Sequence, residues 1–141
     1  MVILFDRFNL SEDIYEVIFA TKQQRIVAKL LVNKMKENGG ELGKTEMSMF
    51  ATELHEGKVV TSLDEPGYEG KKVKISYNKR QFYDRILTPL KSMGLIEYDL
   101  YKKTYKLSEQ FNKDMVKIGL MWLQEMRKPP GVLTDKQKNS Y

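Results

Sequence analysis

Residues 76–107, SYNKRQFYDRILTPLKSMGLIEYDLYKKTYKL, decide the fold, because a helical pattern changes into a strand pattern within this one stretch. Its first half predicts a helix, since apolar residues recur at spacings of four, four and three: Phe82, Ile86, Leu90 and Met93. Ser76 or Asn78 can cap the start of this helix, and Pro89 inside it predicts a bend. Gly94 predicts its end, because glycine readily adopts the positive φ that turns the chain after a helix.

The second half of the stretch predicts a two-stranded antiparallel hairpin over residues 95–107. Apolar and polar residues alternate in the segments 96–99 and 104–107, as in strands that lay one face on a core. The polar turn between these segments carries Lys102 and Lys103 at its tip, and we expect Tyr101 to pack there. A helix with a polar, basic outer face followed by such a hairpin is a shape suited to contacting DNA.

This order of helix, glycine and hairpin resembles the winged-helix family of DNA-binding domains. The residues that carry the resemblance are LKSMGLI at 90–96 and TYKL at 104–107. The resemblance covers roughly residues 21–107, and in its pattern the chain is most similar to small transcription regulators of archaea, archaeal viruses or bacteria. It implies a mostly α fold with a small β-hairpin wing (α+β), namely a winged helix-turn-helix with an additional N-terminal helix and a C-terminal helix.

The resemblance also implies how the chain would bind double-stranded DNA. Helix 78–93 would enter the major groove, and the hairpin tip would approach the backbone or the minor groove. By position, the candidates for contacts with base edges are Asn78, Lys79, Arg80, Tyr83 and Asp84. The candidates for phosphate contacts, which position the protein without specifying a sequence, are Lys71, Lys72, Arg85, Lys102 and Lys103.

Composition and charge agree with a basic DNA-contacting half. The chain has 141 residues, enough for one domain or one domain with an oligomerisation arm. Residues 1–70 carry 8 Lys or Arg against 12 Asp or Glu, whereas residues 71–141 carry 16 against 7. The positive charge that would attract phosphates is therefore concentrated in the half that holds the predicted helix and hairpin.

Composition also excludes several classes of protein. There is no cysteine, so disulfides, thiolate metal sites and cysteine nucleophiles are excluded. No run of about twenty apolar residues predicts a membrane span, and the start of the chain lacks the features of a signal peptide, so we expect a cytoplasmic protein.

Residues 1–58 predict an arm and two helices. Residues 1–20 form an N-terminal arm with a short helix, in which Ile14, Val17 and Ile18 would be buried. Thr21 and Gln24 form a capping box for a helix that ends near Asn38. Glu41 and Leu42 predict a brief strand, Thr45 a second cap, and the next helix has a regular apolar face: Met47, Phe50, Ala51 and Leu54.

Residues 58–75 depart from the family, whose helix-turn-helix joins its helices by a turn of about three or four residues. Val59–Thr61 and Val73–Ile75 could pair as strands within this insertion. Its lysines either extend the basic surface beside the helix or belong to a tolerated surface loop.

Two local features bear on enzymatic chemistry. Residues 38–45, NGGELGKT, approach a phosphate-binding loop, but the first glycine is misplaced by one residue and the segment follows a helix. His55, the only histidine, has no partner for a metal site and no nucleophile to activate. We therefore expect no catalytic residues, no metal and no cofactor, and a protein that is not an enzyme.

Residues 108–128 predict a C-terminal helix that begins at a Ser108 cap and ends before Pro129 and Pro130. Its apolar surface is wider than one contact with a small core requires, so part of it is expected to pack on the first helices. The remainder predicts a homodimer through one stripe: Phe111, Met115, Ile118, Trp122 and Met126. Residues 129–141 are expected to form a flexible tail.

Three alternatives to a transcription regulator stay open. A winged-helix protein–protein interaction module fits the acidic residues Glu97 and Asp99 slightly better. A plasmid or viral replication-initiation factor would share the fold and the DNA binding. A small enzyme is the weakest of the three, because no set of acid, base and nucleophile assembles.

Overall fold

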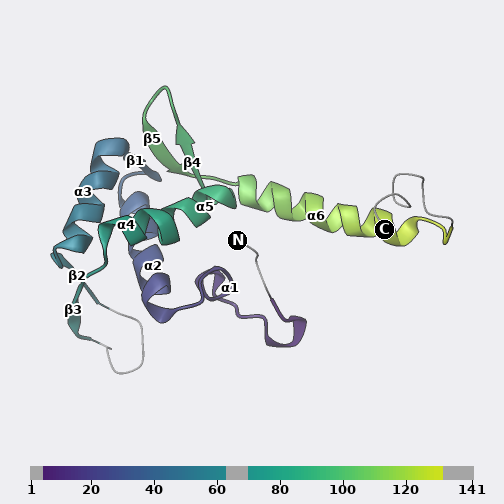
Figure 1. The fold of residues 1–141 in the computed structure, drawn as a ribbon, viewed down its shortest axis with the longest axis horizontal. Helices are drawn as coiled ribbons and strands as arrows, with labels where there is room; N and C mark the ends of the chain where they lie inside the picture. The colour runs from purple at the N-terminus through teal and green to yellow at the C-terminus, as the bar shows by residue number, and fades with distance from the viewer. Residues whose placement is uncertain (1–4, 63–69, 132–141) are drawn as a thin grey trace.

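The protein has an α+β fold in which helices pack against one face of a small antiparallel sheet (Figure 1). The structure, a computed structural model, describes residues 5–62 and 70–131. Parts of the expected arm, insertion and tail, namely residues 1–4, 63–69 and 132–141, lie outside the described residues. The first half contains η1 (Arg7–Asn9), α1 (Ile14–Ile18), α2 (Lys22–Glu37), β1 (Glu41–Gly43), α3 (Lys44–His55) and β2 (Val59–Ser62). The second half contains β3 (Lys72–Ile75), α4 (Lys79–Gln81), η2 (Phe82–Leu87), α5 (Thr88–Ser92), β4 (Ile96–Asp99), β5 (Thr104–Leu107) and α6 (Gln110–Arg127).

Helices α2 and α3 begin at different kinds of cap. The Thr21 hydroxyl accepts the Gln24 N–H at 3.1 Å, which confirms the predicted start of α2. The predicted cap of α3 at Thr45 is wrong, because the helix begins at Lys44 and Gly43 is its N-cap. The Glu46 carboxylate accepts the Gly43 N–H at 3.3 Å, so a side chain from inside the helix supplies the missing acceptor.

The three-stranded sheet has the order β1-β5-β4 and is antiparallel throughout. Tyr105 at its centre pairs with Leu42 on β1 and with Tyr98 on β4. The brief strand predicted at residues 41–42 is thus confirmed. It forms the edge of the sheet next to β5. The predicted hairpin is also confirmed, with strands 96–99 and 104–107.

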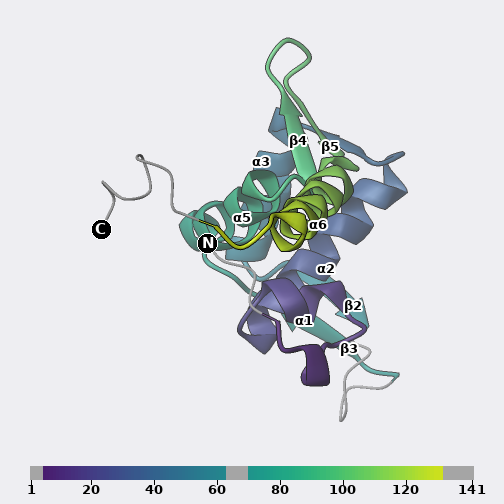
Figure 2. The same ribbon diagram turned by 90° about the vertical axis from the view of Figure 1, so that its right-hand side faces the viewer.

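Strands β2 and β3 form a second hairpin within the insertion. They pair from Val59 with Ile75 to Ser62 with Lys72, which confirms the strands predicted there. This hairpin projects from the end of the domain opposite to the β4–β5 hairpin (Figures 1 and 2). The two hairpins therefore flank the segment that connects them.

That segment, residues 79–92, is one continuous helix made of α4, η2 and α5, which we call the central helix. Asn78 is its N-cap, and Gly94, at a φ of 81°, follows its end as predicted. Pro89 does not interrupt it. The turn before the proline is π-helical, and the Thr88 N–H donates to the carbonyl of Tyr83, five residues earlier.

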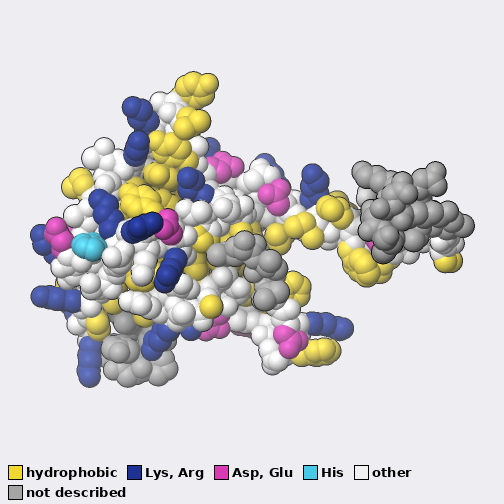
Figure 3. Space-filling view, viewed as in Figure 1, with side chains coloured by type: hydrophobic (Ala, Val, Ile, Leu, Met, Phe, Trp, Pro, Cys, Tyr) yellow, Lys and Arg dark blue, Asp and Glu magenta, His cyan; other side chains and the backbone are white. Residues whose placement is uncertain are grey.

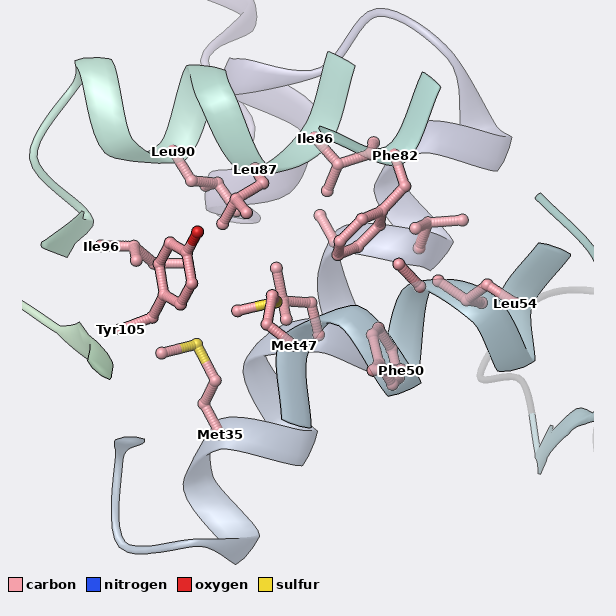
Figure 4. Close-up of a cluster of buried hydrophobic side chains, with 14 of the residues drawn as sticks. Met35, Met47, Phe50, Leu54, Phe82, Ile86, Leu87, Leu90, Ile96 and Tyr105 are labelled. Carbon is pink, nitrogen blue, oxygen red and sulfur yellow. The ribbon is translucent and has the colours of Figure 1, made fainter. Parts of the chain in front are cut away.

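The core lies between α2, α3, the central helix and the sheet (Figure 4). Phe82 is its largest fully buried side chain, and its ring meets that of Phe50 edge-on at 5.7 Å. All four apolar residues predicted for α3 are buried, as are Phe82, Ile86 and Leu90 of the central helix. The described residues contain no buried polar or charged side chain, so apolar burial dominates the stability of this domain.

The two terminal parts of the chain extend from this core. Helix α1 is short and capped by Asp13, and the predicted burial of Ile14 is wrong, because 41% of this residue is exposed. Helix α6 projects away from the body, and none of its residues is buried (Figures 1 and 2). Its N-cap is Glu109 and not Ser108, although the Ser108 hydroxyl accepts the Gln110 N–H. In the part of the chain that the structure describes, no helix is long and apolar enough to span a membrane.

Candidate nucleic-acid interface

The start of the central helix is fixed to α3 by hydrogen bonds from distant parts of the sequence. The Asn78 side chain accepts the Gln81 N–H at 3.1 Å, and His55 Nδ1 accepts the Lys79 N–H at 3.1 Å. His55, for which the sequence predicts no role, thus acts as a second cap on this helix. The 24 residues between His55 and Lys79 explain why no local pattern predicts this contact.

Lys79 is held inside this junction instead of pointing freely into solvent. Its ammonium group donates to the Thr52 hydroxyl at 2.9 Å and to the Ser48 hydroxyl at 3.3 Å, both on α3. A charged donor on two hydroxyl groups makes stronger hydrogen bonds than a neutral one. Of the predicted base-edge candidates, Lys79 therefore has a positioning role, in which it holds the central helix against α3.

The exposed face of the central helix carries Arg80, Asp84 and Arg85. The Arg80 side chain is 91% exposed, and its Nε lies 3.8 Å from a carboxylate oxygen of Asp84 one turn later. Tyr83 is half-buried, with its ring edge-on to Phe82 at 5.5 Å. The face therefore offers a guanidinium group beside a carboxylate, which are a donor and an acceptor suited to base edges in the major groove.

The π-helical turn explains how the central helix places these groups. In a regular α-helix, Phe82 and Leu90 would be about 80° apart around the axis, because eight residues span slightly more than two turns. Both are nevertheless fully buried on one side of the helix. The wider turn at η2 reduces the rotation per residue, so Phe82 reaches the core while Asp84 and Arg85 remain outside.

The tip of the β4–β5 hairpin is shaped by Asp99. Its carboxylate accepts the N–H groups of Tyr101 at 2.9 Å and Lys102 at 3.1 Å. The Lys102 N–H above all holds the pKa of Asp99 below its ordinary value of 3.8. Lys103 has a φ of 51°, a left-handed conformation that is uncommon for a residue with a side chain.

Lys102 and Lys103 are both exposed at this tip, as the sequence predicts for phosphate contacts. The expected packing of Tyr101 is wrong, because this residue is 99% exposed. Leu100 at the same turn is 77% exposed as well, so these two neighbouring side chains do not cover each other. Tyr101 therefore presents a free aromatic ring beside two ammonium groups.

A cluster of Tyr98, Tyr105 and Lys91 connects the hairpin to the central helix. The two rings lie 4.5 Å apart, and the Lys91 ammonium is 5.7 Å from each ring centre. Burial, and to a lesser extent the neighbouring phenols of Tyr83 and Tyr98, raises the pKa of Tyr105. This cation–π contact fixes the base of the hairpin relative to the helix.

At the opposite end of the domain, β3 adds a second group of lysines. Lys72 and Lys74 are exposed, whereas Val73 and Ile75 turn inward, in the alternation expected of a strand with one covered face. Lys71 precedes them and is also exposed. Figure 3 shows that basic side chains run over this view of the molecule from the β4–β5 hairpin, past the central helix, to the β2–β3 hairpin.

The predicted dimerisation residues divide into two groups. Met115, Ile118, Trp122 and Met126 lie along α6 and are exposed. Phe111 lies at the root of α6, where it is half-buried and its N–H donates to the Gly94 carbonyl at 3.0 Å. The expected packing of part of the α6 surface on the first helices is limited to its root, where Phe111 lines a groove with Ile14 and Val32, because Val116 and Leu120 are exposed.

Comparisons of the chain with models of protein families, with curated proteins and with solved structures find no match. Within residues 5–62 and 70–131, no three His, Asp or Glu side chains gather in a group that could hold a metal ion. The chemistry of this surface is therefore inferred from its basic and hydrogen-bonding side chains.

Proposed function

We propose that the chain is a winged-helix protein that binds double-stranded DNA as a regulator of transcription. The order of its elements supports this proposal: α2, β1, α3, the central helix and then the β4–β5 hairpin, with β1 completing the sheet. In this arrangement the central helix is the element for the major groove and the β4–β5 hairpin is the wing. The β2–β3 hairpin is an addition between the two helices of the helix-turn-helix.

The observation that carries the proposal is the series of exposed cations on the central helix and on the two hairpins that flank it. It consists of Lys71, Lys72, Lys74, Arg80, Arg85, Lys102 and Lys103. These residues come from both hairpins and from the helix between them, so their common exposure is a property of the fold and not of one charged segment (Figure 3). Duplex DNA presents phosphates on both sides of the groove that a central helix would enter, which matches basic hairpins on both sides of that helix.

Within this face, the roles of the side chains differ. Arg80 can fork onto a guanine once it leaves Asp84, and Asp84 can accept a hydrogen bond from the cytosine amino group. The lysines of both hairpins neutralise phosphates, which supports affinity but not sequence choice. Lys79 and His55 hold the helix in place, and their contribution to binding is indirect.

The acidic residues that favour a protein-interaction module have partners within the hairpin. Glu97 lies 4.0 Å from the Lys106 ammonium, and Asp99 accepts the N–H groups of the turn. Both carboxylates thus have partners within the hairpin. This observation supports DNA over a protein partner. A replication-initiation factor would use the same surface on DNA.

We further propose that the protein acts as a homodimer joined through α6. The exposed apolar side chains of this helix support a contact that excludes water. Two copies related by a two-fold axis would present two central helices, which is the arrangement that reads a palindromic site.

A salt series of DNA binding tests the proposed function. Fluorescence anisotropy with a labelled duplex would measure Kd between 50 and 200 mM salt for the wild type, Arg80→Ala and Lys102→Ala/Lys103→Ala. We expect log Kd to rise linearly with log salt, and the double variant to lower the slope by about 2, since each phosphate contact contributes about 0.9. Arg80→Ala should weaken binding to a preferred sequence more than binding to random duplex.

Lys113→Ala/Lys117→Ala is the matched control, because it removes two exposed cations from α6. It should leave the salt slope unchanged if phosphates are held by the hairpins and the central helix. Absence of binding at 50 mM salt, or an equal loss in both double variants, would refute DNA binding by this face.

A further inference from the structure

Most of the exposed large apolar side chains lie in two segments, the N-terminal segment and α6. Of the fifteen large hydrophobic residues that are exposed in the described parts of the chain, eleven lie in the N-terminal segment or on α6. In the N-terminal segment they are Phe5, Phe8, Leu10 and Ile14. On α6 they are Met115, Val116, Ile118, Leu120, Met121, Trp122 and Met126. Both segments extend to the same side of the body, with α1 below α6 in Figures 1 and 2.

An apolar groove lies between these two segments, at the root of α6. It has a volume of about 350 Å³ and contacts α1, α2, α5 and the first turn of α6. Its walls include Ile14, Ile18, Val32, Leu107 and Phe111. A groove of this size holds a few large side chains.

We propose that α6 of a second copy fills this groove, in a reciprocal two-fold dimer whose α6 helices run antiparallel. The C-terminal half of each α6, with Trp122 and Met126, lies against the groove at the root of the other. This inference rests on the homodimer of the proposed function but is independent of DNA binding. The apolar surface of α6 is wider than one helix contact needs, because it must contact both the partner's α6 and the partner's groove.

The dimensions of α6 agree with this arrangement. Its 18 residues span about 27 Å at 1.5 Å per residue, so the tip of one helix reaches the root of the other when they overlap completely. Gly119 then lies near the crossing point, and a Cβ at this position would meet nothing within 4 Å in the single chain. Two helices can approach closely where neither carries a side chain.

Charge distinguishes the antiparallel arrangement from other occupants. Arg127 and Lys128 lie at the tip of α6, whereas the segment that gives Ile14, Tyr15 and Ile18 to the groove also carries Glu12, Asp13 and Glu16, of which Asp13 is paired with Lys29. In the antiparallel dimer, the basic tip of one copy approaches the acidic segment of the other, and Lys128 comes level with Glu109. A parallel pair would bring the two basic tips together and leave both grooves open.

The absence of cysteine from the chain makes disulfide cross-linking a direct test. Ile14→Cys and Met126→Cys would be prepared separately, mixed in equal amounts and oxidised gently. Both positions are exposed, so the substitutions should not disturb the fold. We expect a cross-linked product of twice the chain mass in the mixture and little in either variant alone, because the two Met126 residues of an antiparallel pair lie far apart.

Met49→Cys on α3 replaces Met126→Cys in the control mixture, since it is equally exposed but lies at the basic end. The oligomeric state would be measured by light scattering on the wild type and on Trp122→Glu, which should be a monomer with unchanged helix content. A monomeric wild type would refute the homodimer altogether. A dimer that cross-links through Met126→Cys alone, or as strongly with Met49→Cys, would refute the antiparallel arrangement and leave DNA binding untouched.

Discussion

Replacing Gly94 by alanine should destabilise the protein strongly, because this residue joins three elements. It follows the central helix, precedes β4, and accepts the Phe111 N–H at the root of α6. Its φ of 81° costs about 1–2 kcal/mol for a residue with a Cβ. A Cβ would also lie 3.0 Å from the Phe111 nitrogen and 3.2 Å from the Gln110 Cβ. Because backbone atoms cannot rotate away, overpacking adds about 1–3 kcal/mol.

We therefore expect Gly94→Ala to lower the free energy of unfolding by about 2–5 kcal/mol. Gly39→Ala is the matched control, since Gly39 has a φ of 72° but a Cβ there would meet nothing within 4 Å. The control isolates backbone strain, at about 1–2 kcal/mol, from steric overlap. The difference between the two variants measures how tightly α6 is joined to the domain.

Urea unfolding followed by circular dichroism would measure both values at one low protein concentration. The slope with denaturant should stay the same in all three proteins if only stability changes. Equal losses in the two variants would refute the close packing of α6 on Gly94. A Gly94→Ala protein as stable as the wild type would refute the backbone conformation at this junction as well.

Three further predictions concern single side chains. Lys103→Gly should raise stability by about 1 kcal/mol, because it relieves the strain of the left-handed backbone at this residue. It should also weaken DNA binding and lower the salt slope by about 1. A loss of stability would contradict the strain. Lys79→Met should lower stability by about 1–3 kcal/mol, because it leaves the Thr52 hydroxyl without its charged partner. The salt slope of DNA binding should remain that of the wild type. A lower slope would instead indicate that Lys79 contacts a phosphate. Asp13→Asn keeps the α1 cap but loses the ion pair with Lys29, for an expected loss of up to about 1 kcal/mol at pH 7. Burial alone would raise the pKa of Asp13, but the Tyr15 N–H and Lys29 outweigh burial and lower the pKa from 3.8. The stability difference between the wild type and Asp13→Asn should therefore disappear as the pH falls below that value. A stability difference that does not depend on pH would contradict the ion pair.

Local patterns in the sequence predicted most of the secondary structure around the candidate site. The Thr21 cap, the strand at Leu42 and the end of the central helix at Gly94 each depend on residues within a few positions of one another. Periodicity predicted the buried residues of α3 correctly for the same reason. These features follow from backbone preferences and from the hydrophobic pattern, which a single sequence displays directly.

The parts that the sequence did not predict depend on contacts between distant residues. His55 caps a helix that begins 24 residues later, and Lys79 reaches Thr52 across 27 residues, so neither role has a local signal. The opposite failure occurs at Tyr101 and Ile14, whose apolar character suggested burial where the fold supplies no covering surface. Pro89 indicated a disturbed helix, but it did not predict that the disturbance is a π-helical turn at residues 82–87.

The π-helical turn changes the rotation per residue part of the way along the central helix. The portion after η2 is anchored in the core by the buried side chain of Leu90. The portion before η2 is held by hydrogen bonds to the side chains of Asn78 and His55. A regular α-helical η2 with the same number of residues would have a uniform pitch and would turn the earlier portion by about 80° relative to the core, which is the angle between residues 82 and 90 in such a helix. The Arg80 side chain would then point in a different direction relative to the core, although its neighbours along the helix would stay the same. The π-helical turn therefore sets the direction of the exposed side chains independently of the residues that anchor the helix in the core.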